Sequence, residues 1–295
     1  MKKPAILATL TLLAPPMMAA DEPCNPDGGT FHSCITSMNQ RIGQLEKQVG
    51  QLEKENKAQQ TGIQRLKAAN QAQHAEIQAL KRWTLINGLV AYYPFDGNAN
   101  DASGNGHHGT EHGNINYVQG KYGLAANFDG DYSQYIQIDA SNLVGDLTIS
   151  VWIISMGDFS NYRCIVSNEG TKGISSLRLM LWRETGKPVF DFTVNNRATG
   201  GQITGNVNLR SSLAHHLAVI RSGKTLKIFV DGNLVNSGIF NGNADTSDAP
   251  LFIGLSPYTG GSSSGSYPFH GKIDELRIYN RALTDVEIQS LYKQR

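Results

Sequence analysis

The chain contains 295 residues, of which 40% are hydrophobic, and its 26 basic and 25 acidic side chains leave a formal net charge of +1. This balance gives no electrostatic reason to expect a nucleic-acid partner, because such partners attract concentrated positive charge. After residue 20, no segment is apolar over the roughly 20 residues that a membrane span needs, so the sequence predicts no integral membrane insertion.

Residues 1–20 have the features of a secretory signal peptide. Lys2 and Lys3 precede an apolar stretch, and the small residues Ala19 and Ala20 follow it. A membrane anchor is the alternative, but Pro15 lies near the end of a stretch of only about ten apolar residues, which is too short for a span. We therefore expect cleavage after Ala20 and an exported protein, in the periplasm, at the cell surface or outside the cell.

Residues 21–34 form a short cysteine-containing segment. Export makes a disulfide chemically permissible for Cys24 and Cys34, which lie close together in the sequence. The bridge could close within one chain or join chains of an oligomer, and the sequence leaves both open. Cys164 lies apart, in an alternating segment typical of a strand, where we expect a buried, unreactive thiol.

Residues 35–83 predict an α-helical coiled coil, because this stretch lacks proline and repeats apolar residues every 3.5 positions. A single amphipathic helix packed on a globular domain would instead show a broader stripe with a period of 3.6. β-branched residues at a with Leu at d favour a parallel dimer, and the polar layers leave a trimer open. Position a holds Ile35, Ile42, Val49, Asn56, Ile63, Asn70 and Ile77, and position d holds Met38, Leu45, Leu52, Gln59, Leu66, Gln73 and Leu80.

Residues 84–295 change to short alternating runs separated by Gly, Asn, Asp and Ser, which indicates an antiparallel β-sandwich. Only the last segment predicts a helix, with Thr284 as N-cap and Glu287 as its capping-box partner. The Asp129–Gly130 and Asp231–Gly232 pairs fit tight connections between strands. The expected strands are LVAYYPF from Leu89, YIQI from Tyr135, LTISVWII from Leu147, RLMLW from Arg178, VFDFTV from Val189, HLAVIRS from His216, TLKIFV from Thr225, LFIG from Leu251 and KIDELRIY from Lys272.

Five segments between residues 88 and 293 resemble a known family. They are GLVAYYPFDGNANDASGNGHHGT from Gly88, GKYGLAANFDG from Gly120, LTISVWI from Leu147, HHLAVIRSGKTLKIFVDG from His215 and FHGKIDELRIYNRALTDVEIQSLY from Phe269. They resemble the laminin-G-like and pentraxin-like jelly rolls of the concanavalin A-like lectin and glucanase superfamily. The resemblance implies an all-β, antiparallel jelly-roll sandwich behind the N-terminal coiled coil.

This family is functionally broad, so its fold alone does not name a ligand. The chain departs from it at Ala214, where many relatives carry a tryptophan before the histidine strand. Related jelly rolls often hold a metal between an early oxygen-rich loop and a late acidic residue. By that resemblance we expect a structural Ca²⁺ bound by Asp96, Asp101 and Asp274. The alternative is an Asn- and Asp-rich turn whose side chains bond their own backbone.

An enzyme is not expected. The glucanase branch of the superfamily uses paired carboxylates on one strand, in an ExDxxE or ExDxE arrangement that is absent here. In KIDELRIY, regular alternation would send Asp274 and Glu275 to opposite faces. We therefore expect an exported, oligomeric, lectin-like protein that binds extracellular carbohydrate or glycoconjugate. The alternatives are a protein-binding adhesion or structural module and, more remotely, a glycoside hydrolase.

The longest irregular segments carry aromatic and amide side chains suited to sugar faces and hydroxyl groups. Each segment can also be a solvated loop, so the individual residues are hypotheses. They are Phe159 and Tyr162 in MGDFSNY, Asn195, Asn196 and Arg197 in VNNRATGGQITGN, and Tyr258 and Tyr267 in SPYTGGSSSGSY.

Overall fold

The protein was analysed as a computed structural model, which describes residues 30–139, 143, 145–157, 160–168, 177–194, 198–240, 250–257 and 266–294. The chain divides into two compact units, Met1–Ile77 and Gln78–Arg295. The expected signal peptide and Cys24 lie outside the described residues. The signal peptide and the disulfide of Cys24 and Cys34 therefore stay predictions. Among the described helices, none combines the length and the apolarity that crossing a membrane would require.

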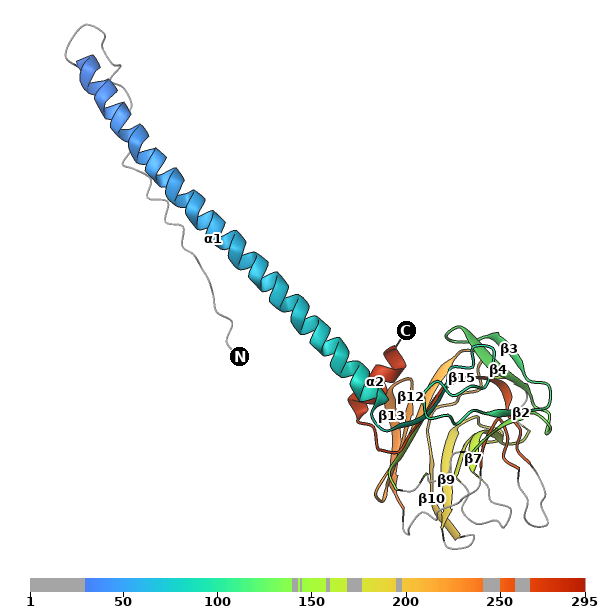
Figure 1. Ribbon diagram of the computed structural model, residues 1–295. Coiled ribbons are helices and arrows are strands. Elements are labelled where there is room, and N and C mark those ends of the chain that lie inside the picture. Colours follow the sequence, from blue (N-terminus) through green and yellow to red (C-terminus); the bar gives the residue numbers. More distant parts are fainter. Residues whose placement is uncertain are drawn as a thin grey trace. The chain divides into compact units, whose positions relative to one another are not determined.

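Helix α1 (Thr30–Ile86) is a single helix of 57 residues (Figure 1). It contains the whole segment predicted as a coiled coil and extends beyond it at both ends. The apolar side chains at positions a and d from Ile35 to Ile77 are exposed, with relative accessibilities of 50% for Ile42, 61% for Leu52 and 72% for Leu66. The first unit therefore presents the apolar residues of the heptad repeat to solvent, and self-association through them stays a prediction.

The second unit begins with the last residues of α1 and continues as strands, with helix α2 near its end. Its elements are β1 (Leu89–Tyr93), β2 (Thr110–His112), β3 (Asn116–Gln119), β4 (Leu124–Asp129), β5 (Tyr135–Ile138), β6 (Leu147–Ser155), β7 (Arg163–Asn168), β8 (Leu177–Leu181), β9 (Pro188–Val194), β10 (Ala198–Thr204), β11 (His215–Ser222), β12 (Thr225–Val230), β13 (Asn233–Ile239), β14 (Leu251–Ile253), β15 (His270–Tyr279) and α2 (Asp285–Lys293).

The strands form two antiparallel sheets that pack face to face (Figure 1). Sheet A has the order β13-β12-β11-β6-β15-β4-β3, with β1 also paired to β15, and sheet B has the order β10-β9-β8-β7-β14-β5-β2. Hairpin neighbours such as β11 and β12 alternate with pairs that are distant in sequence, such as β6 with β15 and β5 with β14, as in a jelly roll. The predicted sandwich is confirmed.

The main core lies between the two sheets. In β6, Leu147, Ile149, Val151 and Ile153 all belong to this core, whereas Trp152 points to the other side of sheet A, because strand residues alternate between faces. That outer side is also covered: Ile288 and Leu291 of α2 pack into a second buried cluster there. Both faces of β6 are therefore shielded from water, and eight of its nine residues are buried.

Helix α2 begins as the sequence predicts. The Thr284 side chain accepts a hydrogen bond from the Glu287 amide, and the Glu287 carboxylate accepts one from the Thr284 amide at 2.7 Å. This capping box satisfies amides that the first turn leaves unpaired. Arg281 adds an ion pair to Glu287 at 2.7 Å.

The two Asp-Gly pairs have different roles. Asp231 and Gly232, with φ of 49° and 76°, connect the paired strands β12 and β13, so this hairpin is confirmed. Asp129 and Gly130 instead lead from β4 in sheet A to β5 in sheet B. This second pair therefore turns the chain between sheets.

Candidate functional site

Three aromatic rings meet at one end of sheet B, and we call them the aromatic platform: Tyr162, Trp182 and Tyr267. The Tyr162 ring lies 5.2 Å from the Trp182 ring and 5.0 Å from the Tyr267 ring, with edge-on geometry in both pairs. All three side chains are half-buried. The Arg183 guanidinium lies 5.7 Å from the Tyr162 centroid. The platform thus presents aromatic surface and a cation together.

Local backbone structure holds each ring of the platform in place. Trp182 follows β8 in a turn closed by a hydrogen bond from its amide to the Lys187 carbonyl at 2.8 Å. Tyr267 exchanges two backbone hydrogen bonds with Ser256, at 3.0 and 3.3 Å. Tyr162 immediately precedes β7. The platform therefore combines residues from three segments that are far apart in the sequence.

The platform covers a small buried cluster of Cys164, Met180 and Val189 on the outer face of sheet B. The Cys164 side chain is fully buried, as expected from the sequence, and its thiol donates to the Leu179 carbonyl at 3.8 Å. These apolar contacts hold one side of each ring and leave part of the other side accessible. The rings are thus fixed before any ligand arrives, which lowers the entropy lost on binding.

A polar group lies on the same outer face, two residues along β8 from Met180 and two residues along β9 from Val189. Arg178 on β8 makes two hydrogen bonds of 3.0 Å to the Asp191 carboxylate on β9. Gln202 on β10 lies opposite Asp191 and is exposed. Burial raises the pKa of Asp191, and the Arg178 charge opposes that shift. The outer face of sheet B therefore carries an ion pair beside the exposed amide of Gln202.

A second aromatic group lies toward the other edge of sheet B. His112 on β2 stacks on Tyr135 of β5 with ring centroids 4.3 Å apart and an interplanar angle of 12°. Phe252 on β14 lies 5.7 Å from the Tyr135 ring. All three side chains are half-buried. Half-buried aromatic side chains therefore occur toward both edges of this sheet.

The structure brings together Tyr162 and Tyr267, two residues that the sequence analysis named from separate loops. Trp182, which lies between them in sequence, was missed as a candidate, although its place at the end of the predicted strand RLMLW could have indicated an end-of-sheet position. The other proposed contacts lie outside the described residues: Phe159, Asn195, Asn196, Arg197 and Tyr258.

Asp101, one of the three predicted calcium ligands, organises the loop after β1. Its carboxylate accepts hydrogen bonds from the amides of Tyr92, Ser103 and His107 at 3.0, 2.8 and 3.0 Å, and from the Ser103 hydroxyl at 2.8 Å. Burial opposes ionisation, but these donors lower the pKa of Asp101 overall. Four donors therefore surround the oxygens that a cation would need.

The other two predicted ligands, Asp96 and Asp274, bind opposite ends of the tight turn that connects β3 to β4. Asp274 accepts hydrogen bonds from the amides of Lys121 and Tyr122 at 2.8 and 3.0 Å. Asp96 accepts one from the Leu124 amide at 2.7 Å. The early loop and the late aspartate are thus brought to the same segment, but amide donors lie against their carboxylates. Within the described ranges, no group of three His, Cys, Asp or Glu side chains could hold a metal.

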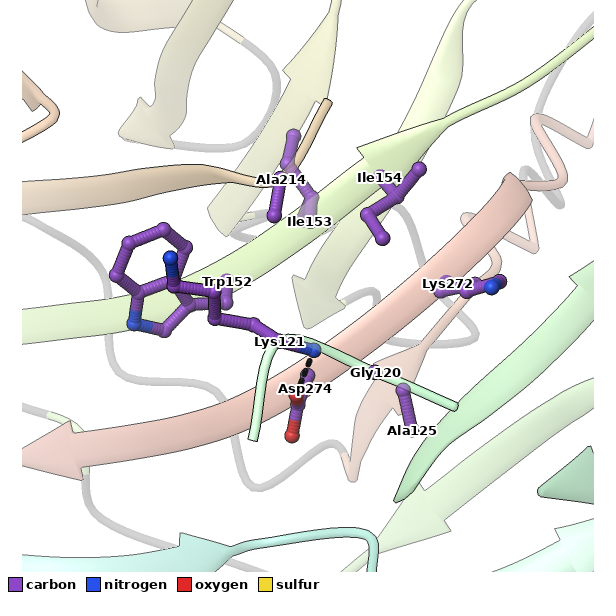
Figure 2. Close-up of a pocket in the computed structure, with 9 residues that line it drawn as sticks. All are labelled: Gly120, Lys121, Ala125, Trp152, Ile153, Ile154, Ala214, Lys272 and Asp274. Carbon is purple, nitrogen blue, oxygen red and sulfur yellow. Dashed lines mark hydrogen bonds between the residues drawn. The ribbon is translucent and has the colours of Figure 1, made fainter. Parts of the chain in front are cut away.

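The turn borders a narrow crevice on the outer face of sheet A (Figure 2). Its walls include Trp152, Ala214 and Asp274, and it is too narrow to admit a water molecule. The Lys121 ammonium lies 4.6 Å from the Trp152 ring centroid. Ala214 thus lies at the crevice, where the tryptophan of many relatives would add bulk. The crevice is a packing feature without room for a ligand.

A bulge in β15 changes the side-chain alternation expected there. Glu275 has φ of 53° and lies between the register pairs Asp274–Trp152 and Arg277–Ser150. Glu275 accepts a hydrogen bond from the Tyr92 hydroxyl at 2.9 Å and pairs with Arg277 at 2.7 Å. The expectation that Asp274 and Glu275 face opposite sides is therefore wrong: both lie on the outer side of sheet A, and both bind neighbouring elements of the fold.

We expect Asp274 to make the stability of the protein depend on pH. Burial, with a contribution from Glu275, raises the pKa of Asp274 to about 7, although the Lys121 and Tyr122 amides oppose the shift. An unfolded Asp titrates near ~3.9, so the folded state binds the proton more tightly and its stability decreases as pH rises from about 4 to about 7. Asn can accept both amide hydrogen bonds without ionising. We expect Asp274→Asn to stabilise the fold by roughly 1–2 kcal/mol at pH 8 and by nothing at pH 4.

Urea unfolding at pH 4, 6 and 8 measures this effect. Asp139→Asn is the matched control, because it makes the same change at an exposed position. A stability difference between Asp274→Asn and the unmodified protein that stays constant over this pH range would contradict the prediction.

Comparison with known proteins finds the same sandwich architecture in other proteins. A family model described as the concanavalin A-like lectin/glucanases superfamily matches residues 129–289, which is more than half of the chain. Among solved structures, domain 4 of AbnA, a GH43 extracellular arabinanase from Geobacillus stearothermophilus, in complex with arabinotriose, is similar. It has a TM-score of 0.57 and 23% identity, over 70% of this chain and 98% of that chain.

Two toxin structures are similar as well. The binding domain of Paraclostridial Mosquitocidal Protein 1 has a TM-score of 0.58 and 17% identity, over 70% of this chain and 52% of that chain. A botulinum neurotoxin type C structure, described as dependent for cell entry on interaction with two ganglioside molecules, has a TM-score of 0.57 and 12% identity. The match covers 70% of this chain and 51% of that chain. The chain thus spans about half of each toxin structure. At these identities the likeness establishes the fold. No curated protein matches the sequence.

Proposed function

Because the chain belongs to the concanavalin A-like lectin/glucanases superfamily, we propose that its sandwich binds an extracellular carbohydrate or glycoconjugate without cleaving its glycosidic bonds. The observation that carries this proposal is the aromatic platform. Its three rings come from separate segments and are held half-exposed beside a cation. The arabinotriose complex and the ganglioside interaction named for two structures of the same fold support the proposal.

The two kinds of group on sheet B suit the two kinds of surface on a sugar. An aromatic ring offers an apolar face to the C–H groups of a pyranose or furanose, and its edge-on neighbours keep it in position. The exposed Gln202 amide offers N–H donors to hydroxyl oxygens, and each such hydrogen bond contributes about 0.5–1.5 kcal/mol. A sugar spanning the platform and these donors would have both needs met.

Oligomerisation through α1 is the second part of the proposal. The exposed a and d positions form a seam whose occupant, by the heptad argument, is a second copy of the same helix in parallel orientation, with a trimer left open. Several sandwiches on one oligomer would raise avidity by roughly 10² to 10⁴ over a single weak site. Export is part of the same proposal, because multivalent binding of this kind suits a surface glycan.

A glycan array probed with the mature full-length protein tests the function. We expect retention on a restricted set of glycans, reduced by Tyr267→Ala. Strong retention on a protein partner with no glycan signal would replace the proposal by the adhesion module. Release of reducing sugar from a polysaccharide would replace it by a glycoside hydrolase.

Calcium binding by Asp96, Asp101 and Asp274 stays a prediction, and the array run with and without Ca²⁺ also addresses it. A bound ion stabilises the folded state by mass action, so its removal should lower the melting temperature. The measurement is a thermal melt before and after chelation, together with elemental analysis. An unchanged melt and no calcium in the purified protein would exclude the site, in agreement with the amide donors that surround these carboxylates.

A further inference from the structure

Ser211, His215 and Asp231, none of which belongs to the aromatic platform, form a continuous hydrogen-bonded chain. The Ser211 hydroxyl lies 2.9 Å from His215 Nε2, and His215 Nδ1 lies 2.9 Å from Asp231 Oδ2. A nucleophilic serine needs this connectivity: a hydroxyl on one imidazole nitrogen and a carboxylate on the other.

The fold fixes the base and the carboxylate independently of the serine. His215 begins β11, and Asp231 occupies the β12–β13 hairpin turn with φ of 49°. The second carboxylate oxygen of Asp231 accepts the His216 amide at 2.9 Å, and the Asp231 amide donates to the His216 carbonyl at 2.8 Å. Asp231 is therefore locked at both backbone and side chain, and it orients the His215 ring.

The carboxylate also selects the tautomer of His215. A proton on Nδ1 can be donated to Asp231, which leaves the Nε2 lone pair to accept the Ser211 proton. The His215 and Asp231 side chains are 19% and 32% exposed, and Ser211 is half-buried. Unlike the buried His216, this group can be reached from solvent.

Two backbone amides lie close to the Ser211 hydroxyl along the chain. The Leu213 amide donates to Ser211 Oγ at 3.3 Å. The Ser212 amide follows the nucleophile directly and has no hydrogen-bond acceptor among the described residues. The amide after the nucleophile is one of the donors that stabilise the oxyanion in serine hydrolases of the nucleophile-elbow type. Here it lies in a loop, so the resemblance is one of chemistry and not of fold.

We propose that Ser211, His215 and Asp231 form an acyl-transfer site that hydrolyses small, unhindered esters. Ser211 Oγ attacks the ester carbonyl carbon while its proton moves to His215 Nε2. The C–O bond to the alcohol breaks, and Nε2 returns the proton to the departing oxygen, which leaves an acyl–Ser211 ester. Water then attacks that ester, Nε2 takes one of its protons and passes it to Ser211 Oγ, and the carboxylic acid is released.

The surroundings of Ser211 define the substrate class. Leu213 is 68% exposed and offers apolar contact to a short acyl chain at the surface. The site is open, so an acetyl-type ester carried on a larger molecule could reach Ser211. This activity is independent of carbohydrate binding by sheet B, and it departs from the sequence expectation of a protein without enzymatic activity.

Two probes on the full-length protein test the site: p-nitrophenyl acetate hydrolysis, and covalent labelling by a fluorophosphonate with the modified residue identified by mass spectrometry. We expect one label per chain, on Ser211. Ser211→Ala should abolish labelling and reduce hydrolysis to background. Asp231→Asn should lower the hydrolysis rate by at least about 100-fold, since loss of the triad aspartate in a serine protease costs about 10⁴.

Ser237→Ala is the matched control, because it removes an exposed serine hydroxyl on β13, outside the site, and should leave both readouts unchanged. Thermal melts separate loss of the site from loss of the fold, and if Asp231→Asn unfolds, Ser211→Ala alone decides. The proposal is overturned if the unmodified protein takes no label under conditions that label chymotrypsin, or if Ser211→Ala hydrolyses the ester as fast as the unmodified protein. A merely structural hydrogen-bond network would change the melting temperature in Ser211→Ala but would show no Ser211 adduct.

Discussion

Substituting Leu45 and Leu52 by Lys in the same chain is expected to lower retention on a glycan-coated surface by at least about 100-fold, without changing the fold of the sandwich. Both leucines occupy heptad position d of α1 and are exposed in the isolated chain, at 53% and 61%. Lysine at two successive d positions would place like charges in the seam of a parallel oligomer. The variant should therefore be monomeric and lose the avidity gained from several sandwiches.

Gln44→Lys with Gln51→Lys is the matched control. It adds the same charge to the same two turns, but at heptad position c, which faces away from the seam. Light scattering gives the oligomeric state of both variants, and surface retention gives the avidity. A full-length protein that is monomeric before any substitution would remove the oligomeric part of the proposal. An oligomeric Leu45→Lys/Leu52→Lys variant would show that the chains associate elsewhere.

Removing one ring of the platform should produce the second-largest effect. We expect Tyr267→Ala to weaken the binding of a soluble oligosaccharide by about 10-fold or more, which corresponds to about 1.4 kcal/mol. Tyr267 contacts Tyr162 and helps to cover Cys164, so the loss includes both a ligand-facing surface and the positioning of its neighbour. Calorimetry in the Leu45→Lys/Leu52→Lys background measures the single site, because avidity would otherwise mask the change.

Tyr132→Ala is the control for this substitution. Tyr132 is 59% exposed in the turn after β4, so its truncation makes the same chemical change without touching the platform. Equal affinity of Tyr267→Ala and Tyr132→Ala for a glycan that the unmodified protein retains would exclude the platform as the binding surface. The site would then have to be sought elsewhere on the sandwich, beginning with the stacked rings of His112 and Tyr135.

The strongly patterned strands could be predicted from the sequence, and the exposed ones could not. The segments YIQI and TLKIFV were predicted with the bounds that β5 and β12 have. In contrast, β2 (TEH) and β13 (NLVNSGI) were missed, because they are largely exposed strands at the sheet edges and their residues lack an apolar face. The alternation that identifies a strand arises from burial of one face, and it fades where neither face is covered.

The site could be predicted only in part, for a different reason. Aromatic residues in two loops were recognisable as candidates, but their meeting with Trp182 depends on the order of strands in sheet B, which local pattern does not encode. Likewise, Asp96 and Asp274 were correctly associated across the chain through the family resemblance. The sequence pattern does not predict the turn that lies between their carboxylates, because that turn depends on a close approach of backbone to side chain. A Cβ on Gly120 would lie 2.5 Å from the Asp274 carboxylate.

The thiol of Cys164 lies beneath the platform, fully buried, with Sγ 3.8 Å from the Leu179 carbonyl. A thiol reagent can reach it only when the overlying rings of Tyr162, Trp182 and Tyr267 move apart. The rate of Cys164 alkylation under native conditions therefore measures how readily this part of the fold opens. A ligand bound on the rings would lower the rate of Cys164 alkylation. The alkylation rate therefore reports whether the platform is occupied, and the measurement needs neither a labelled ligand nor an added fluorophore.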